Sequence, residues 1–301
     1  GQYIAMLSGQ YTACEANNDL PDHCHQHVEN LFSQLTATGR SWRDYEQSMP
    51  NACDPVDGGA AWARDIYSAH HNPALYFTQI QGARVDEAIT PSAPCRNFDL
   101  PMGTTAPNDT SFLDRDLASG DVGNLNLIVP NDCANGHDLC GTRDRIRQFD
   151  DFLASEIPKI QDSPAFGPDG VIFITWDEGS DPPYHPAHIL TAILGPHVQA
   201  GAIDRQRHDH YGLERTLATG LGLAPLAHAR AATPITTIWR EPALLRKAHP
   251  RPRRTAPLPL ASTTVATWQA RRAIASTCRE RPARAGLAGS RSSRWVAESR
   301  Q

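Results

Sequence analysis

The run from Gly170 to Glu178, GVIFITWDE, constrains the fold of this chain more than any other segment. Its residues 171–175 are β-prone and mostly apolar, which is typical of a buried strand. Two acidic residues, Asp177 and Glu178, follow at the end of the strand, where open α/β sheets keep their binding sites. Neighbouring side chains of a strand point to opposite faces, so both acids can serve one centre only if the backbone leaves strand geometry here. Gly179 and the loop after it allow that departure.

Two adjacent carboxylates at such a position favour a divalent metal ion with hard oxygen ligands. Mg²⁺, Ca²⁺ and Mn²⁺ fit carboxylates alone, and additional histidine ligands would admit Zn²⁺. The same pair is equally compatible with a solvated strand end that carries two surface acids. The segment by itself therefore leaves a metal centre and a surface loop as its two interpretations.

The apolar pattern along the chain predicts an α/β fold. A strand, a helix and a second strand follow one another in the order of a right-handed parallel crossover. Near the amino end, Asp22 is a candidate cap and Gly39 a candidate stop for a packing helix. The predicted elements are a helix over 26–38, a strand over 125–129, a helix over 143–161, strands over 170–176 and 188–195, and a helix over 210–222 that Gly220 or Gly222 ends.

The segment 41–112 is rich in Pro, Gly and Asn with scattered aromatic residues, and it is too long for a structureless loop. We expect a folded insertion pinned by Cys53 and Cys95. Six cysteines precede residue 240 without a CxxC pair, which favours disulfides over zinc and an oxidising compartment. The sequential pairs 14/24, 53/95 and 133/140 would each close a loop of modest length, although six thiols allow fifteen connectivities.

A protein of this kind is expected to be secreted or periplasmic, although the matching signal peptide is absent. The chain begins at Gly1 rather than Met, so we expect a start that is either processed or truncated.

Charge divides the chain near residue 240. Residues 240–301 hold 14 of the 28 Lys and Arg but only 3 of the 33 Asp and Glu, so the rest of the chain is acidic. An acidic body without a basic stripe argues against nucleic acid as a partner. No apolar stretch approaches the ~18 to 20 residues of a membrane span. We predict one domain over 1–239 and a disordered Arg/Pro/Ala-rich tail over 240–301, with a polyanion-binding arm as the alternative for the tail.

Histidines crowd around the predicted strand ends. A neutral imidazole can ligate a metal, and an imidazolium can hydrogen-bond a phosphate or protonate a leaving group. Each one taken singly is more typical of a surface or structural histidine, but together with the acid pair they favour a site for an anionic substrate. They are His70, His71, His137, His185, His188 and His210.

Eight segments, in order along the chain, carry a resemblance to a known family. They are LSGQY (7–11), GRSWRDYEQSMP (39–50), HNPALYF (71–77), DLASG (116–120), IVPNDCANGHD (128–138), ITWDEGSD (174–181), HILTAILGPHVQAG (188–201) and HYGLERTLATGLGL (210–223). Together they resemble the secreted phosphoesterases that include bacterial non-specific phospholipases C and acid phosphatases, within the alkaline phosphatase superfamily. The resemblance covers roughly Gly1 to Trp239 and implies an alkaline phosphatase-like fold, a mostly parallel sheet flanked by helices.

The resemblance also implies a reaction. In such enzymes a Ser or Thr at a helix start attacks phosphorus, metal ions and histidines stabilise the phosphoryl oxygens, and a covalent phospho-enzyme is then hydrolysed. Matching positions imply that Asp177 and Glu178 are metal ligands, and that His71 and His137 contact phosphate or donate protons. His188 is implied as a ligand or phosphate contact. His210 matches less well.

The chain departs from the family in two respects. The family's first strand, which ends in a Glu-Asn pair of further metal ligands, and its nucleophile both fall upstream of Gly1. Ser8 and Thr12 do not replace that nucleophile, and Ser8 is expected at the end of a helix. The second departure is Asn135, where members often have an acid, which weakens a charge relay through the His-Asp pair that follows.

Two functions from different classes remain. The first is a metal-dependent hydrolase of small phosphate monoesters, diesters or phospholipid head groups, incomplete at its amino end. The second is a catalytically inactive fragment that retains at most phosphate or metal binding. A third interpretation, an Arg-rich anion-binding protein acting through residues 240–301, predicts salt-sensitive binding by the tail alone.

Overall fold

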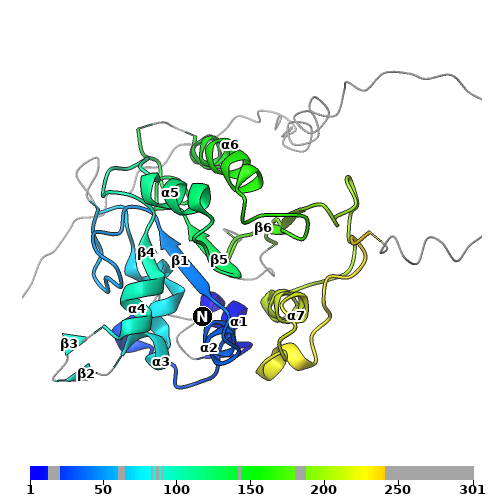
Figure 1. The fold of residues 1–301 in the computed structure, drawn as a ribbon, viewed down its shortest axis with the longest axis horizontal. Coiled ribbons are helices and arrows are strands. Elements are labelled where there is room, and N and C mark those ends of the chain that lie inside the picture. The colour runs from blue at the N-terminus through cyan, green and yellow to red at the C-terminus, as the bar shows by residue number, and fades with distance from the viewer. Residues whose placement is uncertain are drawn as a thin grey trace, which may run out of the picture. The chain divides into compact units, whose positions relative to one another are not determined.

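A strand with three charged residues, β1 (Trp42–Glu46), forms the middle of the main sheet. It pairs in parallel with β4 (Asp99–Pro101) on one side and with β5 (Leu125–Val129) on the other. Figure 1 shows the three arrows side by side. The computed structural model describes residues 1–12, 21–59, 65–82, 91–141, 144–179 and 188–240, and the backbone alone at 84–85 and 88–89.

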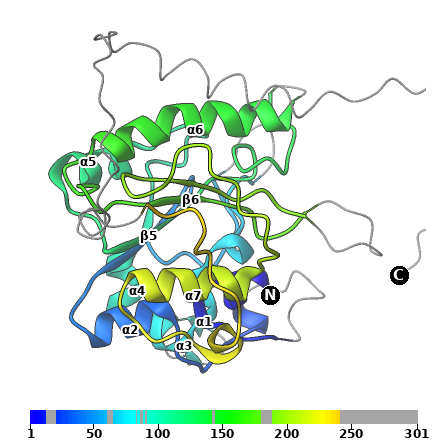
Figure 2. The same cartoon turned by 90° about the vertical axis from the view of Figure 1, so that its right-hand side faces the viewer.

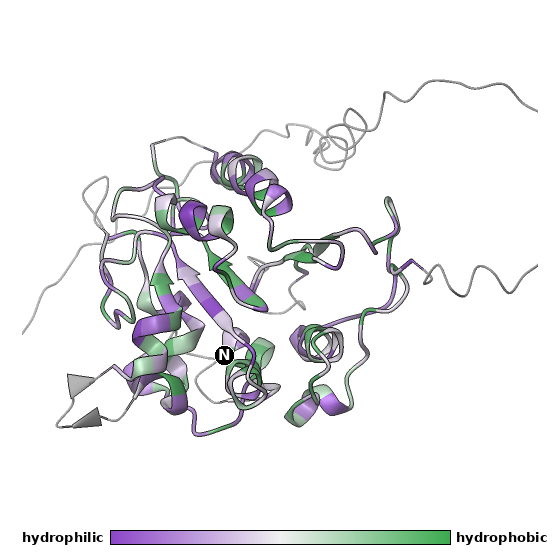
Figure 3. Ribbon diagram, in the orientation of Figure 1, coloured by the Kyte–Doolittle hydropathy of each residue, from purple (hydrophilic) through white to green (hydrophobic). Residues whose placement is uncertain are grey.

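The interpretation of 41–112 as an insertion was wrong, because this segment supplies both β1 and β4. The sequence of β1, WRDYE, lacks the continuous apolar run that is typical of a strand buried on both faces. Figure 3 shows the consequence, a hydrophilic central strand beside the more hydrophobic β5. Tyr45, Asp44 and Glu46 are nevertheless almost fully buried.

Helices cover both faces of this sheet, so the chain has an α/β fold (Figure 2). On one face, Tyr45 packs with Met102, Leu113 and Leu117 beneath α5 (Ser111–Ser119) and α6 (Arg145–Asp162). On the other face, Trp42 joins a larger core that includes residues of α1 (Gln2–Ser8), α2 (Leu31–Ala37) and α7 (His210–Gly220) together with the segment 67–80.

The helix predicted over 26–38 is shorter than expected. Asn30 caps α2 in place of Asp22. Its side-chain oxygen accepts a hydrogen bond from the backbone N–H of Ser33, and its own backbone N–H donates one to the hydroxyl oxygen of Ser33. Gly39 follows the last turn at φ 72°, as expected of a helix stop. The remaining short elements are 3-10 turns at Pro21–His23, Ala69–His71 (η3), Pro73–Tyr76 and Ala227–Arg230, helices α3 (Thr78–Gln81) and α4 (Ala93–Phe98), and strands β2 (Arg84–Val85) and β3 (Ala88–Ile89).

The predicted helices 143–161 and 210–222 are confirmed as α6 and α7, with the positive φ of 64° at Gly222 just beyond the end of α7. Ser8 ends α1, and Gly9 caps it in the left-handed region at φ 64°. A Cβ on Gly9 would lie 2.4 Å from the carbonyl oxygen of Leu226, so only glycine fits the close approach of α1 to this loop.

The strands predicted over 170–176 and 188–195 are present but shorter than expected, as β6 (Ile172–Ile174) and β7 (Ala192–Leu194). β6 pairs antiparallel with β7, because the chain reverses direction between them. The sequence predicted a parallel crossover from β5 through α6 to β6, but within the described residues no ladder joins β5 to β6. β5 is also half-buried rather than buried.

Two of the three expected disulfides are present, Cys53–Cys95 and Cys133–Cys140. The pair 14/24 stays a prediction since Cys14 lies outside the described residues, and so does the disordered tail, of which only Arg240 is described. In the described part of the chain, no helix combines the length and apolar character needed to cross a membrane.

Candidate functional site

The loop after β5 is fixed to the end of β1 by a buried asparagine. The side-chain oxygen of Asn131 accepts hydrogen bonds from the backbone N–H groups of Cys133 and Ala134, each at 3.1 Å. Its amide donates to the hydroxyl oxygen of Ser48 at 2.9 Å. Ser48 follows β1 and has φ 65°, a conformation that non-glycine residues seldom adopt. The carboxyl ends of the two parallel strands are thereby held together.

Asp132, next to this asparagine, contacts a histidine of the 3-10 turn η3. Its Oδ1 lies 3.1 Å from Nδ1 of His71, and the two side chains are 13% and 17% exposed. Its Oδ2 accepts a hydrogen bond of 2.6 Å from the hydroxyl of Ser68. Burial raises the pKa of Asp132, but the hydrogen bonds from His71 and Ser68 outweigh it and leave the pKa below the usual value.

The acid pair follows β6 in backbone that is no longer a strand, since β6 ends at Ile174. The departure from strand geometry that both acids need in order to serve one centre is therefore present. Asp177 is half-buried and its backbone carbonyl accepts a hydrogen bond of 2.5 Å from Nε2 of His210. Glu178 is exposed, and its Oε2 accepts one of 2.9 Å from the side-chain amide of Gln2 in the first turn of α1.

Trp176 joins the acid loop to the loop after β5. Its indole N–H donates a hydrogen bond of 3.0 Å to the backbone carbonyl of Asn135. Its ring also packs against Phe149 of α6, with 4.7 Å between the ring centroids. The loops that carry Asp132 and Asp177 are consequently held to one another.

Tyr3 of α1 lies among the acidic groups of the site. Its ring centroid is 6.1 Å from that of His71. Burial raises the pKa of its phenol well above the usual value, and the negative charges of Asp177 and Glu46 raise it further. The phenol is therefore a neutral proton donor at physiological pH. Residues from α1, β1 and the loop after β6 thus share one electrostatic environment.

His70 belongs to the same environment. Burial and the adjacent His71 lower its pKa, while the charges of Asp132 and Asp177 act in the opposite direction. The T-shaped contact between the two imidazoles has a centroid distance of 4.0 Å. His70 therefore has the charges of both Asp132 and Asp177 acting on it, and the roles predicted for His71 and Asp177 stay predictions.

The other predicted site residues are less enclosed. His137 is 73% exposed and lies 2.8 Å from Asp138, although its charge still acts on Asp132. His188 is exposed and follows a segment outside the described residues, so its proposed role stays a prediction. His185 itself falls in that undescribed segment.

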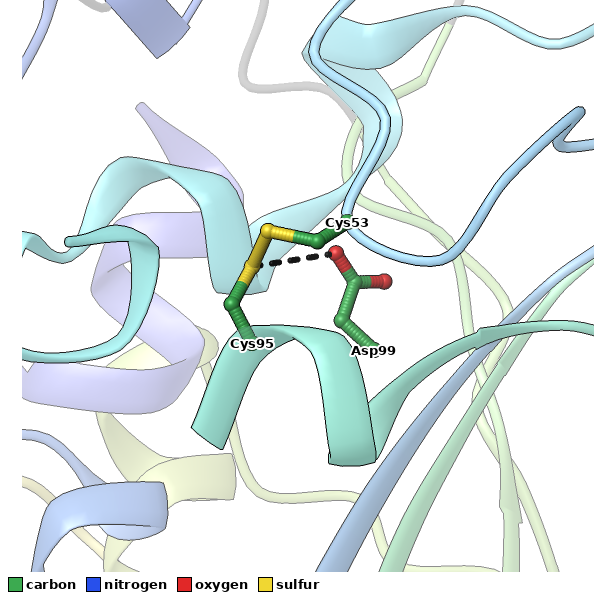
Figure 4. A group of neighbouring side chains, drawn as sticks. All are labelled: Cys53, Cys95 and Asp99. Atoms are coloured by element: carbon green, nitrogen blue, oxygen red, sulfur yellow. Dashed lines mark hydrogen bonds between the residues drawn. A yellow bond between two sulfur atoms is a disulfide. The ribbon is translucent and has the colours of Figure 1, made fainter. Parts of the chain in front are cut away.

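The donor chemistry of Asp177 and Glu178 fits a hard divalent cation, but these two residues supply only part of a coordination shell. Among the described residues, one group of three metal-ligating side chains has its ligand atoms within 4.8 Å of one another: Cys53, Cys95 and Asp99. Figure 4 shows that the two sulfur atoms form a disulfide, which removes them as thiolate ligands. That group is therefore not a metal site.

Sequence reasoning missed three residues of the site. Asp132 could have been recognised from the sequence, because it follows the end of a predicted strand, as Asp177 does, two positions after Pro130. Glu46 had no such signal, because β1 was not recognised as a strand. Tyr3 had none either, since its place among the carboxylates depends on how α1 packs.

Comparison with known proteins adds a family. The Phosphoesterase family model matches residues 2–224, which is most of the chain. No curated protein matches the sequence.

Proposed function

Because this chain belongs to the phosphoesterase family, we propose that it hydrolyses phosphate esters at the strand-end site described above. The observation that carries the proposal is the shared environment of Asp177, His71 and Tyr3, in which carboxylates and proton donors from separate elements surround one region. Family membership supports the reaction class. The finer proposal is an enzyme of acid phosphatase or phospholipase C type, acting on a small phosphate ester or a phospholipid head group.

Asp177 and Glu178 are the proposed metal ligands. A divalent cation bound there, Mg²⁺, Ca²⁺, Mn²⁺ or Zn²⁺, would supply electrostatic stabilisation of the negative charge on the phosphoryl oxygens. The half-buried carboxylate of Asp177 is the stronger candidate, because a less solvated charge holds a cation more tightly. The hydrogen bond from Gln2 orients the carboxylate of Glu178 through Oε2, so Oε1 is the oxygen proposed to bind the cation.

His71, His137 and His188 are the proposed catalytic residues. Each can donate a hydrogen bond to a phosphoryl oxygen or a proton to the leaving group. His71 has the support of a fixed orientation on Asp132. His137 has the support of its electrostatic contact with the same carboxylate, and it is exposed enough to meet a substrate.

The nucleophile is proposed to be a Ser or Thr just upstream of Gly1, which forms a phospho-enzyme during turnover. Support comes from the hydrogen bond between Gln2 and Glu178, because it brings the start of α1 to the acid pair. The family's first strand is proposed to precede that nucleophile. The two disulfides are compatible with a secreted or periplasmic protein.

The test is hydrolysis of p-nitrophenyl phosphate and of p-nitrophenyl phosphorylcholine by the natural full-length protein and its Asp177→Ala variant. We expect the variant to lose hydrolysis of whichever ester the protein accepts, because a charged ligand is removed where negative charge develops. The matched control is Asp169→Ala, whose carboxylate is on the surface and 87% exposed. Full activity in Asp177→Ala would refute the site. Phosphate binding without turnover in the unaltered protein would favour the inactive alternative.

A further inference from the structure

We infer that Asp132 is a positioning residue for His71, and that Ser68 holds Asp132 in place for this task. The inference rests on the proposed function and assigns roles to two residues outside the set predicted from the sequence. It stands on two short contacts, 3.1 Å between Asp132 Oδ1 and His71 Nδ1 and 2.6 Å between Ser68 Oγ and Asp132 Oδ2. Both carboxylate oxygens are thereby used in fixed directions.

The backbone around the three residues is fixed as well. The N–H of Asp132 donates to the carbonyl of Ile66 at 2.9 Å, and the N–H of His71 donates to the carbonyl of Ser68 at 2.9 Å. The N–H of Ala69 donates to Oδ1 of Asp57 at 2.7 Å. Because the backbone at both Asp132 and His71 is held by hydrogen bonds, the two side chains need little reorganisation to act together.

A carboxylate at Nδ1 decides which ring nitrogen carries the proton. Since Asp132 stays ionised, it accepts the hydrogen bond from Nδ1–H, and Nε2 is left as the nitrogen that exchanges a proton with a substrate.

The proton movement balances as follows. When the deprotonated hydroxyl oxygen of the proposed nucleophile forms a bond to phosphorus, the ester P–O bond breaks and its electron pair goes to the leaving oxygen, which takes the proton from Nε2 of His71. The ring becomes neutral and keeps the proton on Nδ1, hydrogen-bonded to Asp132. The carboxylate remains an anion throughout, as expected of a residue that acts through the histidine.

Other titratable groups face this pair, and they bear on any pH profile. His70 shares its turn, Tyr3 approaches from α1, and His137 acts on Asp132 from the same loop. The charges of Glu46 and Asp177 act on Tyr3 as well. Because the charge of Asp132 also acts on Tyr3, Glu46 and His70, a changed profile is read together with the tautomer of the His71 ring, which reports on that residue alone.

The experiment compares Asp132→Asn and Ser68→Ala with the unaltered natural protein in two measurements. The first is the pH profile of kcat and kcat/KM with p-nitrophenyl phosphate. We expect Asp132→Asn to lower kcat about 10- to 100-fold with little change in KM. The pH profile of kcat/KM should change as well, because the substitution removes a charge that acts on the titratable groups of the site. Ser68→Ala should cause a smaller change in the same direction.

The second measurement is the protonated nitrogen of the His71 ring, read by ¹H–¹⁵N correlation without substrate. We expect Nδ1–H in the unaltered protein and loss of that preference in Asp132→Asn. If the unaltered protein hydrolyses no ester, the proposed function fails, and this measurement alone decides the positioning. An unchanged tautomer in a folded Asp132→Asn, or an unchanged pH profile in an active one, would overturn the inference.

The chain offers a matched control for general destabilisation. Asp204 lies 3.1 Å from Nε2 of His208, with side chains 11% and 17% exposed, nearly the same as in the first pair. Asp204→Asn should lower stability to a similar extent and leave the pH profile of hydrolysis in place. A profile shifted equally by both variants would show that loss of a half-buried aspartate, rather than positioning of His71, caused the effect.

Discussion

Asp44 and Asp99 are register partners on adjacent parallel strands, and both are fully buried. Oδ2 of Asp44 accepts a hydrogen bond of 3.2 Å from the N–H of Ala74, and both oxygens of Asp99 accept hydrogen bonds from the Asn72 amide at 2.9 and 3.1 Å. Burial raises the pKa of Asp44 to about 7. Burial and the neighbouring Asp44 raise that of Asp99 well above its usual value. The pair is therefore stable in the fold chiefly when protonated.

This pair predicts a fold that loses stability as pH rises. The folded-state pKa of Asp44, about 7, exceeds that of an unfolded aspartate, about 3.9, so the folded protein binds more protons between these values. The free energy of unfolding should fall as pH rises through this window. Asp44→Asn should flatten the dependence. Urea unfolding at pH 5 and pH 8 measures it, and an equal slope in both proteins would contradict the assignment.

Chelation should abolish hydrolysis if the carboxylates of Asp177 and Glu178 hold a catalytic cation. EDTA treatment followed by dialysis removes the ion, and activity should return on addition of Mg²⁺, Ca²⁺, Mn²⁺ or Zn²⁺. The metal that restores activity at the lowest concentration identifies the preferred one. Activity that persists unchanged after complete chelation would exclude a metal-dependent reaction. Asp177→Ala should bind the restoring metal more weakly, which calorimetry can measure without substrate.

Trp176→Phe should lower activity more than stability. The variant keeps an aromatic ring against Phe149 but loses the hydrogen bond to the carbonyl of Asn135, which is worth about 1 kcal/mol. We expect a modest fall in Tm and a larger fall in kcat, because the acid loop is no longer tied to the loop of Asp132. Thermal melts and initial rates measure the two effects. A fall in Tm without any change in kcat would show that the tie is only structural.

Removal of each of the two disulfides should have a different effect on stability and on activity. Cys53–Cys95 spans 42 residues and Cys133–Cys140 spans 7, so the longer loop restricts the unfolded chain more. Replacing the first pair by serine should cost about 2–4 kcal/mol of unfolding free energy. Replacing the second should cost less stability and more activity, because it closes the loop that carries His137. Denaturant unfolding and rates on both variants check this contrast, and the reverse order would contradict it.

Much of the fold was accessible from the sequence where apolar periodicity is strong. The amphipathic α6 and the apolar β5 were predicted within about two residues, because apolar residues recur at helical spacing along α6 and nearly fill β5. The strand β1 was not predicted, because Asp44 and Glu46 are charged residue types that are usually exposed, although both are buried here. The antiparallel pairing of β6 with β7 also depends on how the chain reverses between them, which strand composition does not encode.

The candidate site was partly accessible for the same reason. A strand that ends in two acids pointed to Asp177, since strand ends of α/β sheets collect functional side chains. The contact of Asp132 with His71 joins residues 61 positions apart, and no local pattern predicts such a meeting. Tyr3 depends on the packing of a whole helix. The residue types alone did not show which of these side chains lie close together in the folded chain.

The length of α1 fixes the rotation of this helix about its own axis. Gly9 packs against Leu226 at one end, and Gln2 is hydrogen-bonded to Glu178 at the other, so the seven residues of the helix, Gln2–Ser8, set how it is rotated about its axis. Each residue of an α-helix advances the rotation by about 100°. Adding or deleting a single residue within it would swing Tyr3 away from His71 while every catalytic side chain remained in the sequence.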